Sequence, residues 1–372
     1  VSWNIDISSG MIYGYVDAIP GSEQGLGNVY SGSSWSMGLG KRLRTEKVLV
    51  TGGAGYIGAQ TVKALSEAGY SVTVFDDLSR GHPEHIAGVP LIIGRCEDEE
   101  ALVDVFSSSQ YDAVVHVAGE SQSSESVSNP AKYFRRNVIG GITLFSTMAK
   151  YGVSKLVFSS SASVYGDPSV MPISEETEVN PKSPYAESKL FLERALAWFD
   201  KAYGLRSISL RYFNAAGADP DLSIGEKHDP ETHLIPLVLQ AISTGEPITV
   251  FGNDYPTCDG TPVRDYVHVA DLAEAHVLAL NALNAGAETS VMNLGSDKGY
   301  SVAEIIQEAQ KVTGRHVPYV IGPRRQGDPA ALVASSQKAR AVLGWAPRLS
   351  SLEDIISTAW QWHLKCVETE NL

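Results

Sequence analysis

From Lys47 onward the sequence alternates short apolar runs with longer segments of helical periodicity. The runs are KVLVTGG, SVTVFDD, PLIIG, AVVHVAG, KLVFSSS and SISLRYFN. An unbroken run of Val, Ile and Leu bounded by glycine is typical of a strand buried on both faces. Helices are expected between and after these runs, among them 58–68, 98–108, 270–284 and 302–313. We therefore predict an α/β fold with a doubly wound, Rossmann-like parallel sheet.

The composition of the sequence changes along the chain, and these changes indicate its domains. Residues 1–45 are rich in Gly and Ser and have no apolar period, so we expect a disordered N-terminal extension. Residues 46–215 carry the apolar runs and should form the Rossmann-like domain. Residues 216–365 have Pro- and Asp-rich loops and should form a smaller C-terminal α/β domain that shares elements with the first, followed by a tail at 366–372.

Charge and cysteine usage exclude several classes of partner. The chain has 43 Asp and Glu against 29 Lys and Arg, so we expect it to bind neither nucleic acid nor an anionic membrane. It has no apolar run of about 20 residues, and it does not begin with the basic, then apolar, then small residues of a secretory signal. These observations predict a cytoplasmic protein. Cys96, Cys258 and Cys366 lie far apart, outside any CxxC or Cys/His group. We expect them to be reduced and expect no metal site.

A glycine-rich turn, TGGAGYIG, directly follows the first apolar run. Gly52, Gly55 and Gly58 there allow a tight turn, close approach of the backbone to a pyrophosphate, and close packing of the next helix. Asp76 ends the second run, 18 residues after Gly58, where a carboxylate accepts hydrogen bonds from an adenosine ribose. This combination predicts a dinucleotide site that prefers NAD to NADP, although the nearby Arg80 weakens the preference.

In the string PYAESK a tyrosine and a lysine stand four residues apart, so Tyr185 and Lys189 share one face of a predicted helix. A neighbouring ammonium and a cationic nicotinamide favour a phenolate, so we expect Tyr185 to be a general base and acid. The preceding strand ends in FSSSASVYG, where Ser161 is the expected proton relay. The YxxxK pattern is common on exposed helices, and its position after the fifth predicted strand favours the catalytic interpretation.

The GxxGxxG spacing is similar to that of the extended short-chain dehydrogenase/reductase superfamily. Over residues 46–365 the chain resembles the UDP-glucose 4-epimerase (UDP-galactose 4-epimerase) family of that superfamily. The resemblance rests on strings such as VLVTGGAGYIG, FSSSASVYG, SPYAESKLFLE, RYFNAAGA, FGNDYPTCDGTPVRDYVHVADLAEAH and RRQGDPAALVASSQKARAVLGW. It implies an isomerase of galactose metabolism that oxidises the sugar at C4, rotates the 4-keto intermediate and returns the hydride.

The resemblance also implies roles for individual residues. Tyr185 would be the base, Lys189 its partner and Ser161 the relay. The residues implied to line NAD are Gly52, Gly55, Tyr56, Ile57, Gly58, Asp76, Asp77, Arg95, Ala118, Gly119, Asn137, Ser161, Tyr185, Lys189 and Phe213. The residues implied to hold the UDP-sugar are Ser161, Tyr185, Asn214, His233, Phe251, Arg264, Arg325 and Asp328. Arg95 and Ser121 replace an Asp and a Lys that are usual in the family, which leaves the affinity for NAD open.

Two further hypotheses stay open beside UDP-glucose/UDP-galactose interconversion. One is a 4-epimerase of UDP-N-acetylhexosamines or UDP-pentoses, because Leu332 stands where some relatives have a tyrosine. The other is a non-catalytic, NAD-binding regulatory protein. Dehydration is disfavoured because an Asp-Glu pair of the related dehydratases is replaced by Ser160 and Ser161.

The family resemblance further implies a homodimer formed by helices near 130–150 and 184–204. The second of these segments carries apolar residues that suit either a helix bundle at an interface or an ordinary core. They include Leu190, Leu192, Leu196 and Phe199.

Overall fold

The computed structural model describes residues 2–6, 11–15, 45–325 and 328–370. The chain divides into two compact units, Val1–Arg44 and Thr45–Leu372. Within the first unit, β1 (Ser2–Asp6) pairs antiparallel with β2 (Met11–Tyr15). The rest of the expected extension lies outside the described residues, so its disorder remains a prediction.

The second unit is built on a seven-stranded sheet whose strand pairs are all parallel. Its order is β12-β8-β7-β6-β3-β4-β5. The strands are β3 (Lys47–Thr51), β4 (Ser71–Asp76), β5 (Leu91–Ile93), β6 (Ala113–His116), β7 (Lys155–Ser159), β8 (Arg206–Tyr212) and β12 (Ser290–Leu294). The first six are the six predicted apolar runs, so the doubly wound fold is confirmed. The chain order reverses between β3 and β6, which makes the carboxyl ends of these two strands a topological switch point.

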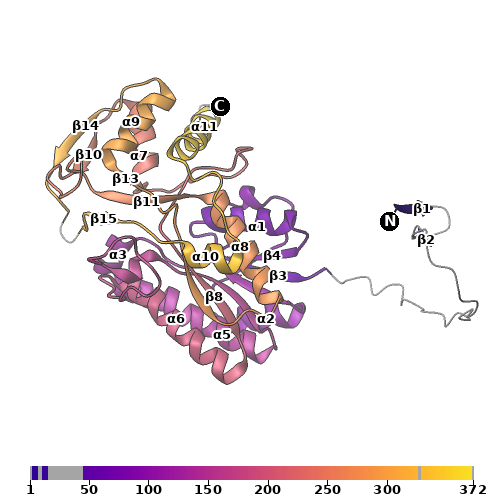
Figure 1. Ribbon diagram of the computed structural model, residues 1–372. Coiled ribbons are helices and arrows are strands. Elements are labelled where there is room, and N and C mark those ends of the chain that lie inside the picture. Colours follow the sequence, from indigo (N-terminus) through magenta and orange to yellow (C-terminus); the bar gives the residue numbers. More distant parts are fainter. Residues whose placement is uncertain (1, 7–10, 16–44, 326–327, 371–372) are drawn as a thin grey trace, which may run out of the picture. The chain divides into compact units, whose positions relative to one another are not determined.

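Helices cover both faces of the sheet (Figure 1). Along β3, Val48 and Val50 pack in the cluster on one face and Leu49 in the cluster on the other, as the alternation of strand side chains requires. The first face is covered by α1 (Tyr56–Glu67), α8 (Val269–Asn284) and α10 (Gln337–Leu343). The second is covered by α2 (Glu99–Ser108), α5 (Gly140–Lys150) and α6 (Pro184–Tyr203). The expected helices at 58–68, 98–108 and 270–284 are thus confirmed, with bounds that differ by at most two residues.

A second cluster of elements gathers around β10, β14, α7 and α9, beside α11 (Figure 1). Residues such as Ile235, Ile305 and Ile355 form its core. Its helices are α7 (Leu234–Thr244), α9 (Val302–Thr313) and α11 (Leu352–Glu370). Its strands are β9 (Asn214–Ala216), β10 (Ile248–Phe251), β11 (Val263–His268), β13 (Gly299–Ser301), β14 (Tyr319–Gly322) and β15 (Ala331–Leu332). The chain alternates between the two clusters, because β12 joins the large sheet from within residues 216–365.

Short elements complete the described chain between the larger ones. They are η1 (Pro83–Ile86), α3 (Ser123–Ser128), α4 (Pro130–Tyr133), the π-helical η2 (Phe134–Ile139) and η3 (Ala162–Tyr165). Of the cysteines in the described residues, Cys96 is buried, Cys258 is exposed and Cys366 is partly exposed, and none of the three is in a disulfide. Among the described residues, no helix combines the length and the apolar character needed to cross a membrane.

Candidate active site

The glycine turn between β3 and α1 has the geometry of an anion cradle. Gly52 has φ +72°, and a Cβ there would lie 2.5 Å from the backbone nitrogen of Ala118. A Cβ on Gly58 would lie 2.0 Å from the carbonyl oxygen of Gly52. A Cβ on Gly55 would instead meet no protein atom nearer than 3.5 Å, so packing within the protein does not require glycine at this position. The absence of a side chain here keeps the turn open to an incoming group.

The helix that follows presents its positive end at the same place. Tyr56 and Ile57 open α1, whose N-terminus has no side-chain cap and no acidic residue in its first turn. Its first N–H groups and the helix dipole therefore favour an anion in front of Gly55. The residues present thus fit the pyrophosphate of a dinucleotide.

Asp76 ends β4 and is buried beside this turn. Its carboxylate accepts hydrogen bonds from the backbone N–H of Ala54 (2.9 Å) and of Leu78 (2.8 Å). Burial raises the pKa of Asp76, and these two bonds partly offset the shift. Asp76 therefore fixes the glycine turn to the end of β4, and its contact with ribose remains a prediction.

Asp77 organises the charges at the same edge of the sheet. Its carboxylate accepts from the backbone N–H of Ser79 (2.9 Å) and pairs with Arg136 (2.9 Å) and with Arg95 (3.3 Å). Burial would raise the pKa of Asp77, but the bonds from Ser79 and the charge of Arg136 lower it below its usual value. The structure thus brings Arg95 to the Asp77 carboxylate.

Tyr185 and Lys189 lie one turn apart on α6, which Ser183 caps by accepting from the backbone N–H of Ala186. Both side chains are buried. Ser161 caps η3 at the end of β7 and lies close enough to the phenol of Tyr185 to influence its pKa. The structure therefore brings together the three residues that the sequence predicted as catalytic.

The electrostatics of this trio differ in one respect from the sequence-based expectation. Burial raises the pKa of Tyr185, and the Ser161 side chain opposes this shift. Lys189 donates to the carbonyl oxygen of Ser159 (2.9 Å), and burial lowers its pKa to about 8 although the charge of Glu193 raises it. Because burial of the phenol is the larger effect, the protein alone leaves the pKa of Tyr185 above its usual value.

The loop after β6 is tied to the catalytic helix by Asn137 of the π-helical η2. Its side chain accepts from the backbone N–H of Glu120 (2.8 Å) and donates to the carbonyl oxygen of Glu120 (3.1 Å) and the hydroxyl of Ser188 (2.9 Å). A Cβ on Gly119 would lie 3.0 Å from the Asn137 oxygen. Asn137 thus holds Ala118 and Gly119 opposite the glycine turn.

The residues predicted for the sugar nucleotide form several groups. Arg264 pairs with Asp328, and the guanidinium of Arg325 lies 4.1 Å from the ring centre of Phe251. Asn214 donates to the carbonyl oxygen of Asp265 (2.8 Å).

Two other predicted residues have different surroundings. Phe213, like Leu332, packs against a small apolar cluster that includes Tyr165 and Leu190. His233, just before α7, instead bonds to Glu226.

A buried network of hydrogen bonds and an ion pair near the end of β7 was not predicted from the sequence. Glu193 pairs with Arg211 and accepts from the hydroxyl of Ser160, and Arg211 donates to the hydroxyl of Tyr165 (2.8 Å). The spacing of four that links Tyr185 to Lys189 continues to Glu193, and it was the available signal for this network.

A parallel sheet with a glycine turn at its switch point and a buried tyrosine–lysine pair defines a dinucleotide-dependent enzyme of the short-chain dehydrogenase/reductase type. A family model described as "NAD dependent epimerase/dehydratase family" matches residues 48–295, and the chain belongs to this family.

Several similar proteins are UDP-glucose 4-epimerases. The UDP-glucose 4-epimerase of Lacticaseibacillus casei is 50% identical over 318 residues, which are 85% of this chain and 96% of that protein. A crystal structure of UDP-glucose 4-epimerase from Brucella ovis in complex with NAD has a TM-score of 0.83 at 44% identity and covers 85% of this chain and 98% of its own. One from Stenotrophomonas maltophila, with bound NAD and formylated UDP-arabinopyranose, has a TM-score of 0.84 at 37% identity and covers 87% and 99%.

Proposed function

We propose that this protein is an NAD-dependent UDP-sugar 4-epimerase that interconverts UDP-glucose and UDP-galactose. The observation that carries the proposal is the buried phenol of Tyr185 beside the Ser161 hydroxyl, at the carboxyl end of the strands where ligands bind in such sheets. The identity of about half to curated UDP-glucose 4-epimerases, over nearly their whole length, supports the same activity.

In this function the residues of the chain move one proton and hold two phosphorylated ligands. Bound NAD would supply the acceptor for the hydride from C4 of the sugar and the donor for its return to the opposite face. Tyr185 takes the proton of the 4-hydroxyl, directly or through Ser161, and later gives it back. Lys189, charged below its pKa of about 8, favours the phenolate by its positive charge.

The substrate half supplies local cations to an acidic protein. Arg264 is held by Asp328, and Arg325 lies over Phe251, so both guanidinium groups are positioned before a diphosphate arrives. Guanidinium groups bind phosphate oxygens through paired donors, which suits the diphosphate of a UDP-sugar.

The test is incubation of purified protein with UDP-galactose and no added cofactor, with UDP-glucose measured by chromatography. Formation of UDP-glucose until the two sugars reach equilibrium is the expected result, and it would show that NAD is retained through purification. If neither added NAD nor any other UDP-sugar gives turnover, the non-catalytic, NAD-binding alternative would replace this proposal.

A preference for N-acetylated or pentose sugars is the second candidate. The observation that favours it is the aliphatic Leu332, which packs against the same apolar cluster as Phe213. The family resemblance implies that some relatives have a tyrosine at this position. The ligand in the Stenotrophomonas structure also shows that a relative accommodates a UDP-pentose derivative. Comparison of kcat/KM for UDP-galactose, UDP-N-acetylgalactosamine and UDP-arabinopyranose would rank the three sugars.

We further propose a homodimer, acting in the cytoplasm in galactose metabolism as the family resemblance implies. The apolar residues first considered for the interface, Leu190, Leu192 and Leu196, are buried in the core of the chain itself. The support comes instead from four large apolar side chains that stay exposed on η2 and α6. They are Phe134, Ile139, Phe191 and Trp198.

A further inference from the structure

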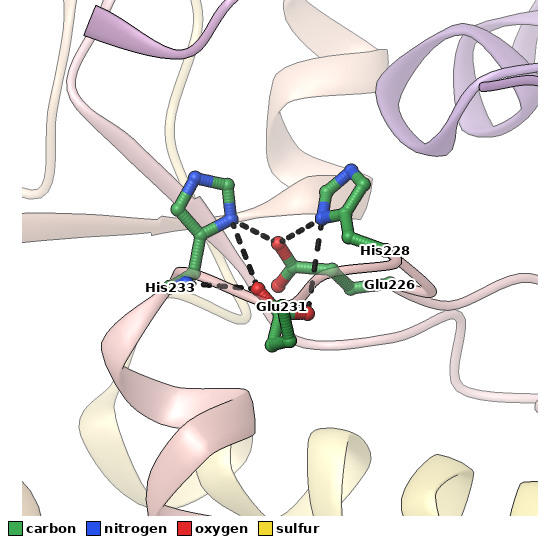
Figure 2. A group of neighbouring side chains, drawn as sticks. All are labelled: Glu226, His228, Glu231 and His233. Carbon is green, nitrogen blue, oxygen red and sulfur yellow. Dashed lines mark hydrogen bonds and ion pairs between the residues drawn. The ribbon is translucent and has the colours of Figure 1, made fainter. Parts of the chain in front are cut away.

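Two glutamates and two histidines converge in the loop between β9 and α7 (Figure 2). One ligand atom from each of Glu226, His228, Glu231 and His233 lies within 4.8 Å of all the others. Nδ1 of His228 is 3.2 Å from Glu226 Oε1 and 3.8 Å from Glu231 Oε2. Nδ1 of His233 bonds to Glu226 Oε1 and is 3.9 Å from Glu231 Oε1. Both rings therefore turn the same nitrogen toward the same two carboxylates.

These separations match the size of a small divalent ion. Imidazole nitrogens and carboxylate oxygens bind zinc at about 2.0–2.2 Å, and tetrahedral ligands at that distance lie roughly 3.4 Å apart. Three of the four His–Glu separations, 3.2, 3.8 and 3.9 Å, lie near this value. The fourth, between His233 and Glu226, is shorter, so these two side chains would have to move apart by about 1 Å to complete a tetrahedron. A set of two imidazoles and two carboxylates suits zinc better than calcium or magnesium, which prefer oxygen ligands alone.

The backbone that carries these side chains is already fixed. The indole of Trp362 on α11 donates to the carbonyl oxygen of Glu226 (3.0 Å), and a Cβ on Gly225 would lie 2.3 Å from the Trp362 ring. The Glu226 side chain is only 6% exposed. Glu231 is oriented from behind, because its carboxylate accepts from the backbone N–H of Thr232 (2.6 Å) and of His233 (2.8 Å). Such supporting bonds are typical of the surroundings of metal ligands.

The group also has an entry path. His228 and Glu231 line a surface cavity of 750 Å³, together with the loop from Leu78 to His82 that follows Asp77. An ion arriving through this cavity would meet both side chains without any movement of a secondary-structure element.

We propose that Glu226, His228, Glu231 and His233 form a four-coordinate zinc site of the structural type. With four protein ligands no position is left for a reacting water, so the ion would brace the loop between β9 and α7. Coordination through Nδ1 leaves Nε2 of His233 free for the sugar-nucleotide contact that the family resemblance implies. The expectation that the chain has no metal site rested on the positions of its cysteines, and this group contains no cysteine.

The test measures metal content on the full chain, prepared without metal-affinity chromatography and without UDP-sugar, so it does not depend on the proposed activity. Protein dialysed against zinc and then against buffer should retain about one zinc per chain, and cobalt in its place should give the visible absorption of a tetrahedral site. Chelation should lower the Tm and zinc should restore it.

Matched variants locate the ion. His228→Gln and, separately, Glu231→Gln should each weaken zinc binding by ~100-fold or more. The control His316→Gln removes an exposed histidine on another loop and should bind zinc like the wild type. Absence of retained zinc in the wild type, or zinc retention by His228→Gln and Glu231→Gln that equals that of the wild type, would overturn the site. The four groups would then be ion pairs alone, and zinc would leave the Tm of the wild type unchanged.

Discussion

At the residue scale, the phenol oxygen of Tyr185 is the atom on which the proposed chemistry depends. Tyr185→Phe removes this oxygen and leaves the ring packing intact, so turnover should fall by about 10²–10⁴-fold while bound NAD is retained. Turnover of UDP-galactose and NAD released on denaturation would be measured in parallel. Tyr203→Phe is the matched control, because Tyr203 is exposed at the end of the same helix. A Tyr185→Phe variant with wild-type turnover would remove Tyr185 from the mechanism.

Lys189 predicts a pH dependence of stability. Burial lowers its pKa in the folded state to about 8, against about 10.4 in an unfolded chain. Between these values the unfolded state binds more protons, so the contribution of Lys189 to the free energy of unfolding rises with pH. Relative to Lys189→Met, the wild type should gain about 2 kcal/mol between about pH 7.5 and about pH 9.5.

Urea unfolding of the wild type and of Lys189→Met over this pH range would measure the difference between their free energies of unfolding. A constant difference would mean that Lys189 titrates near its usual pKa in the folded protein. A difference that falls with pH would contradict the burial of its charge.

The buried pair of Glu193 and Arg211 makes a second prediction about stability. Glu193→Gln leaves the Arg211 charge unpaired in a desolvated place and should cost about 3–5 kcal/mol of the free energy of unfolding. Replacing both residues, as Glu193→Leu with Arg211→Met, should cost less than Glu193→Gln alone. Denaturant unfolding of the wild type and both variants tests this order, and a double variant less stable than Glu193→Gln would contradict it.

At the scale of elements, the two ends of the glycine turn should respond differently to one added methyl group. Gly58→Ala would place a Cβ 2.0 Å from the carbonyl oxygen of Gly52, so the packing of α1 on β3 and the Tm should suffer. Gly55→Ala meets only an ordinary contact at 3.5 Å, so the fold should survive while NAD binding weakens. Thermal melts and NAD titrations of both variants separate the two effects. Equal NAD affinity in Gly55→Ala and the wild type would contradict the cradle.

The strands and most helices of the large sheet were predictable because burial on both faces leaves an unbroken apolar run for each strand. The trio of Tyr185, Lys189 and Ser161 was also predictable, since a spacing of four and a strand end are local features. The contact of Asp76 with the backbone of the glycine turn was not, because the sequence does not show which neighbours a carboxylate will reach. The same limit hid the partner of His233, because loops have no period from which to infer proximity.

At the scale of the whole molecule, the exposed apolar side chains of η2 and α6 predict an interface between two copies of the chain. Phe191→Lys combined with Trp198→Glu should convert a dimer to a monomer without unfolding it, since both side chains are at least half exposed. Light scattering coupled to size exclusion measures the mass. Tyr319→Glu, at an exposed site on β14, is the control and should leave the mass unchanged. A monomeric wild type, or a double variant that stays dimeric, would contradict the interface.

The hydrogen bonds from α11 to the loop after β9 affect the order in which the protein folds during synthesis. Trp362 and Lys365 bond to the carbonyl oxygens of Glu226 and Leu222, partners that are 136 and 143 residues earlier in the chain. A nascent chain makes β3 to β8 first, so the nucleotide half is able to assemble while translation continues. The loop that carries His233 receives its support only when α11 has left the ribosome. The order of translation therefore places completion of the proposed sugar-nucleotide side after pairing of the strands β3 to β8.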